Sequence, residues 1–447
     1  MYTYIHVELM TRELDSKLLL SLIAANRGLK VYLGNLNQIV QKKGTPPGIF
    51  HNKDITASAY IVQMFKNINK NKISITSQDD EGGVEDRKVD RFVQLRYSKK
   101  TLKLVKKVFT WGAFDYKELT RVFKNYTSKI INTGSPRLDF YKPILKQKEI
   151  IKKNILISSN FGTVLERRSF WDFMSIQKKA YTIGNFENSS EEKKQYDYFS
   201  HNIKIIYEYI KLIRFLTSKY KNNFFILRPH PVESISGWKE LLGNIPNLQI
   251  IRKGSLFESI FESKIVIQTG CYSAIESTLA GVDVINFNPF FNEKLDKYFP
   301  TKLGHKCINI NEVDKKIKQL LGKDNYFIAF KKKKLNEIKK RINFDEQKLS
   351  SILIVDEWLK IFKSKKIIDN KYYFIFNTKI FFKKIIYRIK NWIKFFLLIK
   401  DPQDTKFPKI DLVELIKKSK DIIEKLDLDR NIKIEIIDKN LCYIKKK

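Results

Sequence analysis

Short apolar runs alternate with longer segments of helical periodicity through the first 140 residues. Residues 2–9 form an apolar, strand-like run, and residues 13–26 carry apolar side chains at helical spacing. Gly28 is placed to end that helix, and residues 31–33 begin a second strand. The alternation continues with a helix expected over 57–68 and strands over 72–76, 105–111 and 129–133. This order predicts a parallel sheet covered by helices, which is a Rossmann-like unit.

A second series of the same kind begins at residue 154. Strands are expected over 154–159, 224–227, 248–251, 264–268 and 283–287, with helices over 196–219, 256–261 and 273–280. The two Rossmann-like halves join near residues 141–153. Because ligands of open parallel sheets bind beyond the carboxyl ends of the strands, we expect both halves to present their loops to a cleft.

The chain is therefore expected to have three parts: a Rossmann-like domain over 1–145, a second over 146–325 and a basic helical extension over 326–447. The length of 447 residues fits two domains, since single cores seldom grow past about 250 residues. The extension contains a basic amphipathic segment over 372–400 and ends with a helix over 412–425 and a strand over 432–437.

The composition is strongly basic, with 85 Lys and Arg against 48 Asp and Glu and a formal net charge of +37. Such a charge suits an anionic partner, or it reflects a general bias toward Lys, Ile and Asn. A basic nucleic-acid-binding protein is the non-enzyme alternative, but no zinc-site spacing, RNP-like aromatic motif or helix-turn-helix pattern supports it, so we expect no nucleic-acid partner. Segment 372–400 can instead lie on a membrane surface or pack on the body of the protein.

Other global features indicate a cytoplasmic protein. The three cysteines are far apart and form no CxxC pair, so neither a disulfide framework nor a metal site is expected. The first residues lack the basic and apolar regions of a signal peptide. No stretch of about 18 uncharged apolar residues predicts a membrane-spanning helix.

The most informative motif lies between an apolar strand and a helix, over 265–285. Its small polar turn places Thr269, Tyr272 and Ser273 at a helix N-terminus, where backbone N–H groups and the helix dipole favour a phosphate. Glu276, one turn into the helix, can accept hydrogen bonds from a ribose diol. Ser273 and Glu276 can equally form a capping box without any ligand.

A second motif, Arg-Pro-His-Pro, ends the strand expected over 224–227. The two prolines exclude a helix and hold Arg228 and His230 beyond the strand end. Arg228 can pair bidentately with a phosphate, and His230 can donate to a phosphate or pack on a base.

A third motif places adjacent carboxylates after a strand of the first half. Asp80 and Glu81 precede Gly82, and repulsion between neighbouring carboxylates can raise a pKa toward that of a useful base. Gly82 can let the backbone approach a ligand, and the alternative is a solvated acidic turn. Further candidates are a carboxylate that ends the first strand, an anion ligand in the first helix and two residues that follow strand ends: Glu8, Arg12, Arg137 and Asn160. For Asp15 and Asp139, capping or hinge roles are favoured over catalysis.

Taken in order, these motifs resemble those of bacterial surface carbohydrate biosynthesis proteins, within the GT-B glycosyltransferases. The motifs typical of this family occur in the same order in this chain. They lie at Glu8 with residues 12–15, residues 80–82, Trp111-Gly112, residues 133–139, Asn160-Phe161, residues 228–233 and residues 271–276. The match covers roughly residues 1–320. A wider resemblance is to GT-B sialyltransferases and capsular Kdo transferases, and CDP-glycerol-using teichoic acid transferases share a similar layout.

The resemblance implies a GT-B-like α/β fold, with two Rossmann-like domains facing a cleft, and a glycosyltransferase activity. The donor would be a nucleotide sugar, most simply a CMP-linked acidic sugar such as Kdo or a nonulosonate, and the acceptor a surface polysaccharide or its lipid-linked precursor. By this likeness Asp80 or Glu81 would be catalytic, and His230 and Ser273 would hold the nucleotide. No cofactor or metal is expected, because Arg, His and a helix N-terminus can stabilise a departing phosphate. A CDP-glycerol-type glycerophosphotransferase and a sugar-nucleotide epimerase are the enzymatic alternatives, and the sequence leaves inversion or retention open.

Overall fold

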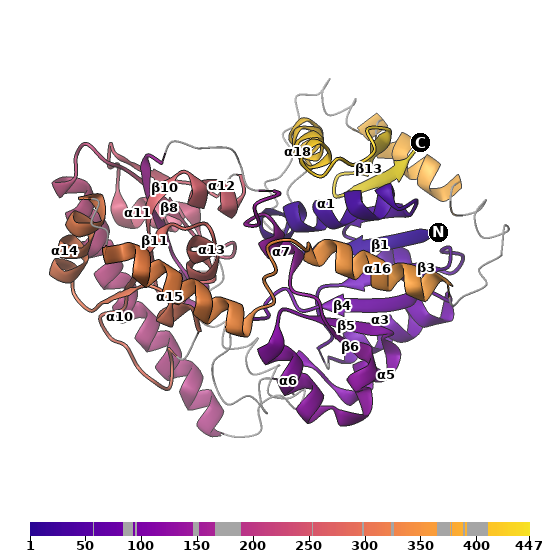
Figure 1. The fold of residues 1–447 in the computed structure, drawn as a ribbon, viewed down its shortest axis with the longest axis horizontal. Coiled ribbons are helices and arrows are strands. Elements are labelled where there is room, and N and C mark those ends of the chain that lie inside the picture. The colour runs from indigo at the N-terminus through magenta and orange to yellow at the C-terminus, as the bar shows by residue number, and fades with distance from the viewer. Residues whose placement is uncertain are drawn as a thin grey trace. The chain divides into compact units, whose positions relative to one another are not determined.

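The computed structural model describes residues 1–56, 58–83, 93, 96–145, 152–165, 189–252, 254–296, 299–322, 326–363, 376, 378–387, 389–390 and 410–447. The chain divides into two compact units. Described residues of the first unit fall within 1–145 and 341–447, and those of the second fall within 152–340. Each unit is built on its own β-sheet (Figure 1).

The first unit is an eight-stranded sheet in the order β13-β14-β2-β1-β3-β4-β5-β6. Its strands are β1 (Tyr2–His6), β2 (Lys30–Gly34), β3 (Gly48–Asn52), β4 (Ser74–Gln78), β5 (Lys107–Thr110), β6 (Ile130–Asn132), β13 (Ile432–Asp438) and β14 (Leu441–Lys446). Its helices are α1 (Met10–Asn26), α2 (Asn37–Gln41), α3 (Ala59–Lys70), α5 (Lys99–Leu104), α6 (Ala113–Val122), η1 (Lys124–Lys129), α7 (Pro136–Asp139), α16 (Ser350–Lys363) and α18 (Leu412–Lys425). The six strands from β1 to β6 are parallel, as the alternation of elements predicts.

The second unit is a six-stranded parallel sheet in the order β12-β11-β10-β7-β8-β9. Its strands are β7 (Asn154–Ser158), β8 (Phe224–Arg228), β9 (Leu248–Ile250), β10 (Ser263–Gln268), β11 (Asp283–Phe287) and β12 (His305–Cys307). Its helices are α8 (Gly162–Leu165), α10 (Ser189–Lys219), α11 (Ile235–Leu242), α12 (Leu256–Phe261), α13 (Ser273–Leu279), η3 (Phe299–Lys302), α14 (Ile310–Leu321) and α15 (Tyr326–Arg341). Counted from β7, this is the 3-2-1-4-5-6 order of the Rossmann fold. The predicted fold class, α/β with two Rossmann-like units, is confirmed.

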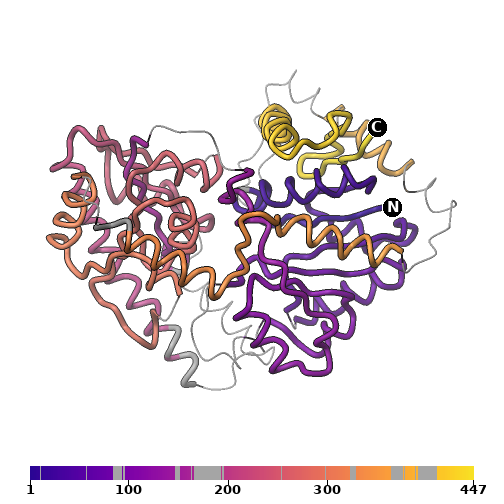
Figure 2. The backbone as a smooth tube through the Cα atoms, viewed as in Figure 1, coloured from indigo at the N-terminus to yellow at the C-terminus, as the bar shows by residue number. Residues whose placement is uncertain are grey.

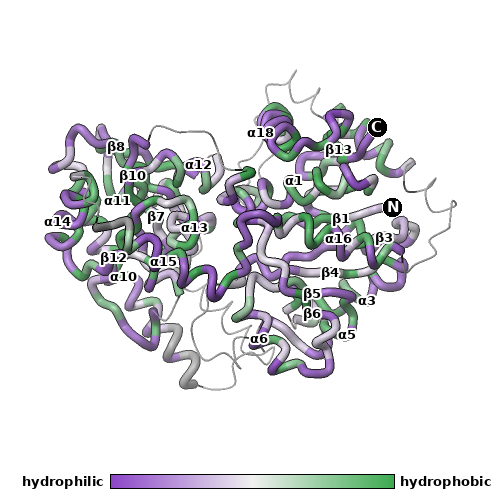
Figure 3. The backbone as a smooth tube through the Cα atoms, viewed as in Figure 1, coloured by the Kyte–Doolittle hydropathy of each residue, from purple (hydrophilic) through white to green (hydrophobic). Residues whose placement is uncertain are grey.

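Helix α1 lies at the centre of the first unit. Its residues Leu18, Leu19 and Leu22 are fully buried, because the helix packs against the sheet and also against α7, α16 and α18. Gly28 ends it as predicted: with φ of +82° its N–H bonds to Ala25 and lets the chain turn into β2. In Figure 3, hydrophobic and hydrophilic residues alternate along the helices that cover both sheets, as amphipathic helices require.

The residues after 325 do not form one extension. Helix α15 belongs to the second unit up to Lys340, and the chain from Arg341 onward belongs to the first. The predicted helix over 412–425 and strand over 432–437 are confirmed as α18 and β13. A second strand that the pattern did not predict, β14, pairs antiparallel with β2, so the hairpin extends the first sheet. Figure 2 shows this C-terminal segment beside the N-terminal strands.

Candidate active site

In the first unit, the strand order reverses between β1 and β3, which are neighbours in the sheet. Beyond the carboxyl ends of strands at such a point, open parallel sheets form the crevice where ligands bind. Helix α1 starts directly after β1 at this edge, and β3 and β4 end there. Side chains from these segments therefore define the first part of the candidate site.

A buried lysine of α1 connects two carboxylates at this edge. Lys17 Nζ donates to Glu13 Oε2 at 2.7 Å and to Asp80 Oδ2 at 2.8 Å. Glu13 also accepts the backbone N–H groups of Glu8 at 2.9 Å and Leu9 at 3.2 Å, so it satisfies donors at the start of α1. Glu13 and Lys17 are almost completely buried, whereas the side chain of Asp80 is 23% exposed. Asp80 is thus the member of this trio that a ligand can reach.

Burial and neighbouring charges separate the proton affinities of the two carboxylates. Burial raises the pKa of Asp80 to about 6, although Lys17 and Arg12 act in the opposite direction. Burial also tends to raise the pKa of Glu13, but the charges of Lys17 and Arg12 outweigh this effect and lower that pKa to about 2. The carboxylates raise the pKa of Lys17 despite its burial. At neutral pH the trio therefore contains a firmly ionised Glu13, a cation, and in Asp80 a carboxylate suited to accept a proton.

The acidic residues on either side of Asp80 are held by arginines. Arg96 donates to Asp79 Oδ2 at 2.8 Å and to Glu81 Oε2 at 2.9 Å. A guanidinium nitrogen of Arg12 lies 3.6 Å from Glu81 Oε1. Asp79 is buried and Glu81 is 52% exposed. Their ion pairs fix the loop that carries Asp80.

The side chain of Trp111 packs directly against Gly82. A Cβ atom at this position would lie 2.2 Å from the indole ring of Trp111, so no side chain fits. The indole N–H of Trp111 donates to the carbonyl of Asp79 at 2.6 Å. The sequence predicts Gly82 in contact with substrate, and the structure shows that its missing side chain lets Trp111 support the acidic loop.

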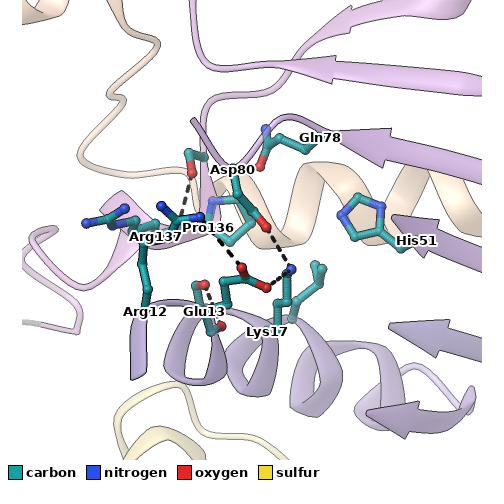
Figure 4. A pocket seen from close by; sticks show the side chains of 11 residues that line it. Arg12, Glu13, Lys17, His51, Gln78, Asp80, Pro136 and Arg137 are labelled. Carbon is teal, nitrogen blue, oxygen red and sulfur yellow. Dashed lines mark hydrogen bonds and ion pairs between the residues drawn. The ribbon is translucent and has the colours of Figure 1, made fainter. Parts of the chain in front are cut away.

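A pocket of about 20 Å³, enough for about one water-sized group, lies at this edge of the first unit. It is lined by Arg12, Glu13, Ser16, Lys17, Leu20, His51, Gln78, Asp80, Ser135, Pro136 and Arg137. Figure 4 shows Arg12 and Arg137 on one side of the Asp80–Lys17 pair and His51 on the other. Of the predicted residues, Arg12, Asp80 and Arg137 meet here, whereas Glu8 forms an ion pair with Lys53 and is not among the lining residues.

In the second unit the strand order reverses between β7 and β10. The loops after β7, β8 and β10 leave the same edge of the sheet, since these three strands are neighbours. They carry Asn160, His230 and the turn over 269–273. The structure thus brings the predicted Arg-Pro-His-Pro and small-polar motifs to one edge, on either side of the loop that follows β7.

A buried glutamate joins the loops after β7 and β8. Glu233 accepts the hydroxyl of Ser159 at 2.6 Å, the backbone N–H of Phe161 at 2.6 Å and the indole N–H of Trp238 at 2.7 Å. Burial raises the pKa of Glu233 against these three donors. A Cβ atom on Gly162 would come within 2.4 Å of Val232 and 3.3 Å of the His230 ring. The imidazole is therefore held close over the start of α8.

Arg228 points into the protein. Its guanidinium donates to Ser259 Oγ at 3.0 Å and to the carbonyl of Gly254 at 2.5 Å, and only 6% of the residue is exposed. The sequence predicts Arg228 as a phosphate ligand. In the structure these bonds fix the loop before α12, so we describe Arg228 as a positioning residue for this edge.

The turn after β10 is fixed by its neighbours. Gln268 Oε1 accepts the backbone N–H of Cys271 at 2.7 Å, and its amide nitrogen donates to Asn286 at 3.0 Å. Gly270 adopts a φ of +60°, which favours glycine. Ser158 Oγ lies 3.5 Å from Cys271 Sγ, so the turn also contacts the end of β7. The turn is preorganised without a ligand.

The predicted residues of this turn differ in exposure. Asn160, His230 and Tyr272 are partly exposed, Thr269 is 9% exposed, and Ser273 and Glu276 are buried. Tyr272, and not Ser273, is the N-cap residue of α13, and its side chain makes no capping bond, so the capping-box alternative for Ser273 and Glu276 is wrong. Within the described chain, Ser273 Oγ is buried without a hydrogen-bond partner.

Sequence reasoning assigned no role to several residues that organise these edges. Glu13 and Lys17 stand four residues apart on one helix, which is a recognisable ion-pair spacing. Nothing in the sequence connects Lys17 with Asp80, 63 residues later. His51 lies on β3, a strand that the pattern did not predict. Glu233 stands three residues after His230, inside a motif that had already drawn attention.

No protein-family model and no curated protein matches the sequence. Solved structures with a similar chain path include a UDP-GlcNAc 2-epimerase from Methanocaldococcus jannaschii in complex with UDP-GlcNAc and UDP (12% identity, TM-score 0.46, 80% of this chain and 100% of that chain). Others are a glycosyltransferase from Rickettsia africae ESF-5 (12%, 0.41, 81% and 99%) and the wall teichoic acid polymerase TagF with CDPG (11%, 0.42, 81% and 89%). All three TM-scores are below 0.5, so the fold assignment rests on the strand orders of the two sheets.

Proposed function

We propose that the protein is a glycosyltransferase that moves a sugar from a nucleotide donor to a cell-surface polysaccharide or its lipid-linked precursor. The observation that carries this proposal is Asp80, a carboxylate with a pKa of about 6 in a pocket at the ligand-binding edge of the first unit. A general base that deprotonates a sugar hydroxyl needs such a pKa and partial access to solvent. By the sequence resemblance, the donor is a CMP-linked acidic sugar such as Kdo or a nonulosonate.

The second unit would bind the nucleotide. Asn160, His230 and Tyr272 are partly exposed at the edge where Rossmann-like sheets receive nucleotides. His230 would donate to the donor's phosphate, and Thr269 with the backbone of the turn would contact the same group. In the reaction the bond between the sugar carbon and the phosphate oxygen breaks, and CMP leaves with the electron pair. The acceptor oxygen bonds to that carbon, and Asp80 takes its proton.

The test pairs two neighbouring carboxylates. Asp80→Asn should lower kcat for sugar transfer about 10²–10⁴-fold, as expected for loss of a general base. Glu81→Gln, whose carboxylate is half exposed and paired with Arg96, should lose far less. Equal losses in the two variants, or full activity of Asp80→Asn, would remove Asp80 from this role.

Nucleotide and product analysis decide between the enzymatic alternatives. Thermal shift with CMP, CDP, UDP and GDP identifies the bound nucleotide, because a ligand of the native state raises the melting temperature. His230→Ala should abolish that shift. Release of CMP with a new glycosidic bond supports the proposal. Transfer of glycerol phosphate from CDP-glycerol, or conversion of a UDP-sugar into its epimer without transfer, would replace it.

We further propose that the basic segment after residue 375 places the enzyme on an anionic membrane. Much of the predicted segment 372–400 lies outside the described residues. In the helical stretch 378–387, Lys384 pairs with Glu435 and Lys383 lies 2.8 Å from Asp438, which attaches this stretch to β13. The same segment carries large apolar side chains that are more than half exposed: Phe381, Phe382, Ile386 and Ile389. Exposed apolar residues flanked by lysines suit the headgroup boundary of an anionic bilayer.

A pair of substitutions tests this association. Phe382→Asp with Ile386→Asp should reduce co-sedimentation with anionic phospholipid vesicles, whereas Tyr207→Asp, at a similarly exposed residue of α10, should not. Undiminished co-sedimentation of the double variant would contradict the proposal. Among the residues that the structure describes, no helix is long and apolar enough to cross a membrane.

A further inference from the structure

A chain of hydrogen bonds runs from α16 to the pocket of the first unit. The indole nitrogen of Trp358 lies 3.0 Å from Thr76 Oγ1, and Thr76 Oγ1 lies 3.1 Å from His51 Nδ1. Trp358 and Thr76 are fully buried, and His51 is 4% exposed. His51 and Thr76 are paired residues on the adjacent strands β3 and β4.

The hydrogen bond from Trp358 to Thr76 favours one tautomer of His51. The Trp358 indole can only donate, so the Thr76 oxygen accepts its proton. The Thr76 hydroxyl keeps its own proton, which it can donate to His51 Nδ1 at a distance of 3.1 Å. An imidazole that accepts at Nδ1 carries its single proton at Nε2. Thr76 and Trp358 are therefore positioning residues that orient the N–H of His51.

The imidazole is kept neutral. Burial lowers the pKa of His51 to about 3, and the positive charge of Lys17 adds to this effect. A neutral ring in this tautomer offers one donor, Nε2–H, on the side away from Thr76. His51 lines the pocket that Asp80 also lines, and Lys17 is near both.

Gln78 also lines this pocket and supplies an acceptor. It lies two residues after Thr76 on β4, and side chains two apart on a strand share a face. Its amide nitrogen donates to the carbonyl of Gly134 at 2.7 Å, and no bond to Oε1 is found among the described residues. The pocket thus combines a neutral donor and the cations Arg12, Lys17 and Arg137 with neutral and anionic acceptors. This combination matches a hydroxyl group, which both donates and accepts.

We propose that His51 binds the hydroxyl group that enters this pocket, donating from Nε2 to its oxygen while Asp80 accepts its proton. The identity of that group as a sugar hydroxyl rests on the proposed function. The role of His51 is to orient the oxygen so that its proton points to Asp80. A neutral donor suits this task, because an imidazolium beside Lys17 would compete for the Asp80 carboxylate.

Nitrogen NMR tests the tautomer without any reaction. In protein labelled with ¹⁵N-histidine, the signals missing from His51→Gln identify the ring. They should show a protonated Nε2 and an unprotonated Nδ1, and should not titrate between about pH 5 and 8. The Nε2 signal should move when free Kdo, N-acetylneuraminate or glycerol is added. A proton on Nδ1, a ring that titrates in this range, or no response to any of the three probes would overturn the proposal.

Transfer kinetics then separate a donor from a packing residue. His51→Leu, which has no N–H, should lower kcat/KM about tenfold, the usual effect of losing one hydrogen bond. His51→Gln keeps an N–H at similar reach and should stay within about threefold of wild type. The nucleotide-induced thermal shift reports the second unit and should be unchanged in both. Equal losses in the two variants would overturn the role of His51. If the wild-type protein transfers no sugar, the proposed function fails, and the NMR result still decides the tautomer and the hydroxyl contact.

Discussion

A carboxylate can exchange a proton near neutral pH only if its surroundings raise its pKa close to that pH. Asp80 meets this requirement because burial favours its protonated form, and Lys17 favours its ionised form. Glu13 uses the same lysine but stays ionised, since the charges of Lys17 and Arg12, together with the N–H of Glu8, outweigh its burial. Two carboxylates that share one buried cation thus differ in pKa, because the charge of Glu13 also raises the pKa of Asp80.

The pH dependence of transfer should report Asp80. Its base form is required, so kcat/KM should rise as the pH increases through about 6 and then level off. Asp80→Asn should lack this limb.

The free energy of unfolding should change in the opposite direction. The pKa of Asp80 in the folded protein is above the unfolded value of 3.8, so wild type loses stability relative to Asp80→Asn as the pH rises through about 6. A pH profile without a limb near this value, or a stability difference independent of pH, would contradict the assignment.

Removing the shared cation should be costly. Lys17→Met leaves Glu13 and Asp80 without their common partner in a buried site, so the free energy of unfolding should fall by about 3–5 kcal/mol. The same substitution at the exposed Lys417 should change it by less than about 0.5 kcal/mol. Urea denaturation of the two variants makes the comparison. A loss at Lys17 no larger than that at Lys417 would show that the trio contributes little.

Glu233 should act through the loops that it joins. In Glu233→Gln one of the three donors now meets an amide N–H₂, so the unfolding free energy should fall by about 1–3 kcal/mol. The loops after β7 and β8 would lose their connection, and the thermal shift caused by the preferred nucleotide should shrink. Glu240→Gln on the exposed side of α11 is the matched control. An unchanged nucleotide shift in Glu233→Gln would limit this residue to stability alone.

At the scale of elements, helix α16 shows how the chain returns to the first unit. Asp139 accepts the backbone N–H groups of Ser350 and Ser351 at 2.9 Å each, so a residue of α7 caps a helix more than 200 residues later. Lys142 lies 2.8 Å from Asp139, and both are almost fully buried. The expectation of a capping role for Asp139 is confirmed.

The buried cap should matter more than an exposed one. Asp139→Ala leaves the Lys142 ammonium unpaired in the interior and should lower the unfolding free energy by about 3–5 kcal/mol. Asp411→Ala removes the solvent-exposed cap of α18 and should cost about 1 kcal/mol. Guanidinium denaturation compares the two, and similar losses would contradict the special role of the buried cap.

Element type was predictable where apolar periodicity was strong, as in α1, β7 and β10. The strand β3 was not predicted, because it follows two prolines and contains Gly48 and Asn52, residue types that are depleted in strands, and with it the sequence analysis missed His51. The pocket itself required knowledge of pairing: Lys17 and Asp80, or Thr76 and Trp358, are separated by stretches whose path no local pattern determines. The sequence located the motifs that follow strand ends, but it did not predict where their side chains point. Arg228 was expected to bind a phosphate, and its guanidinium instead bonds to Ser259 and Gly254 inside the protein.

At the scale of the whole molecule, the first unit is assembled from both ends of the chain and the second from the middle. Strand β14 covers the edge of β2, where Val31 and Leu33 are fully buried. Removal of residues 427–447 should expose that edge and produce aggregation, because unpaired strand edges pair with other chains. Removal of Lys447 alone should have no such effect. Size-exclusion chromatography distinguishes the outcomes, and a monomeric, stable 1–426 fragment would contradict this expectation.

The late pairing of β14 also has a consequence for synthesis on the ribosome. The second unit is complete once residue 340 has emerged, but residues 441–446 follow about 100 residues afterwards. At a synthesis rate of about 5–20 residues per second, this is a delay on the order of ten seconds. Throughout that interval the edge of β2 has not yet been paired by β14. We therefore expect the nascent chain to depend most on a ribosome-associated chaperone during this interval.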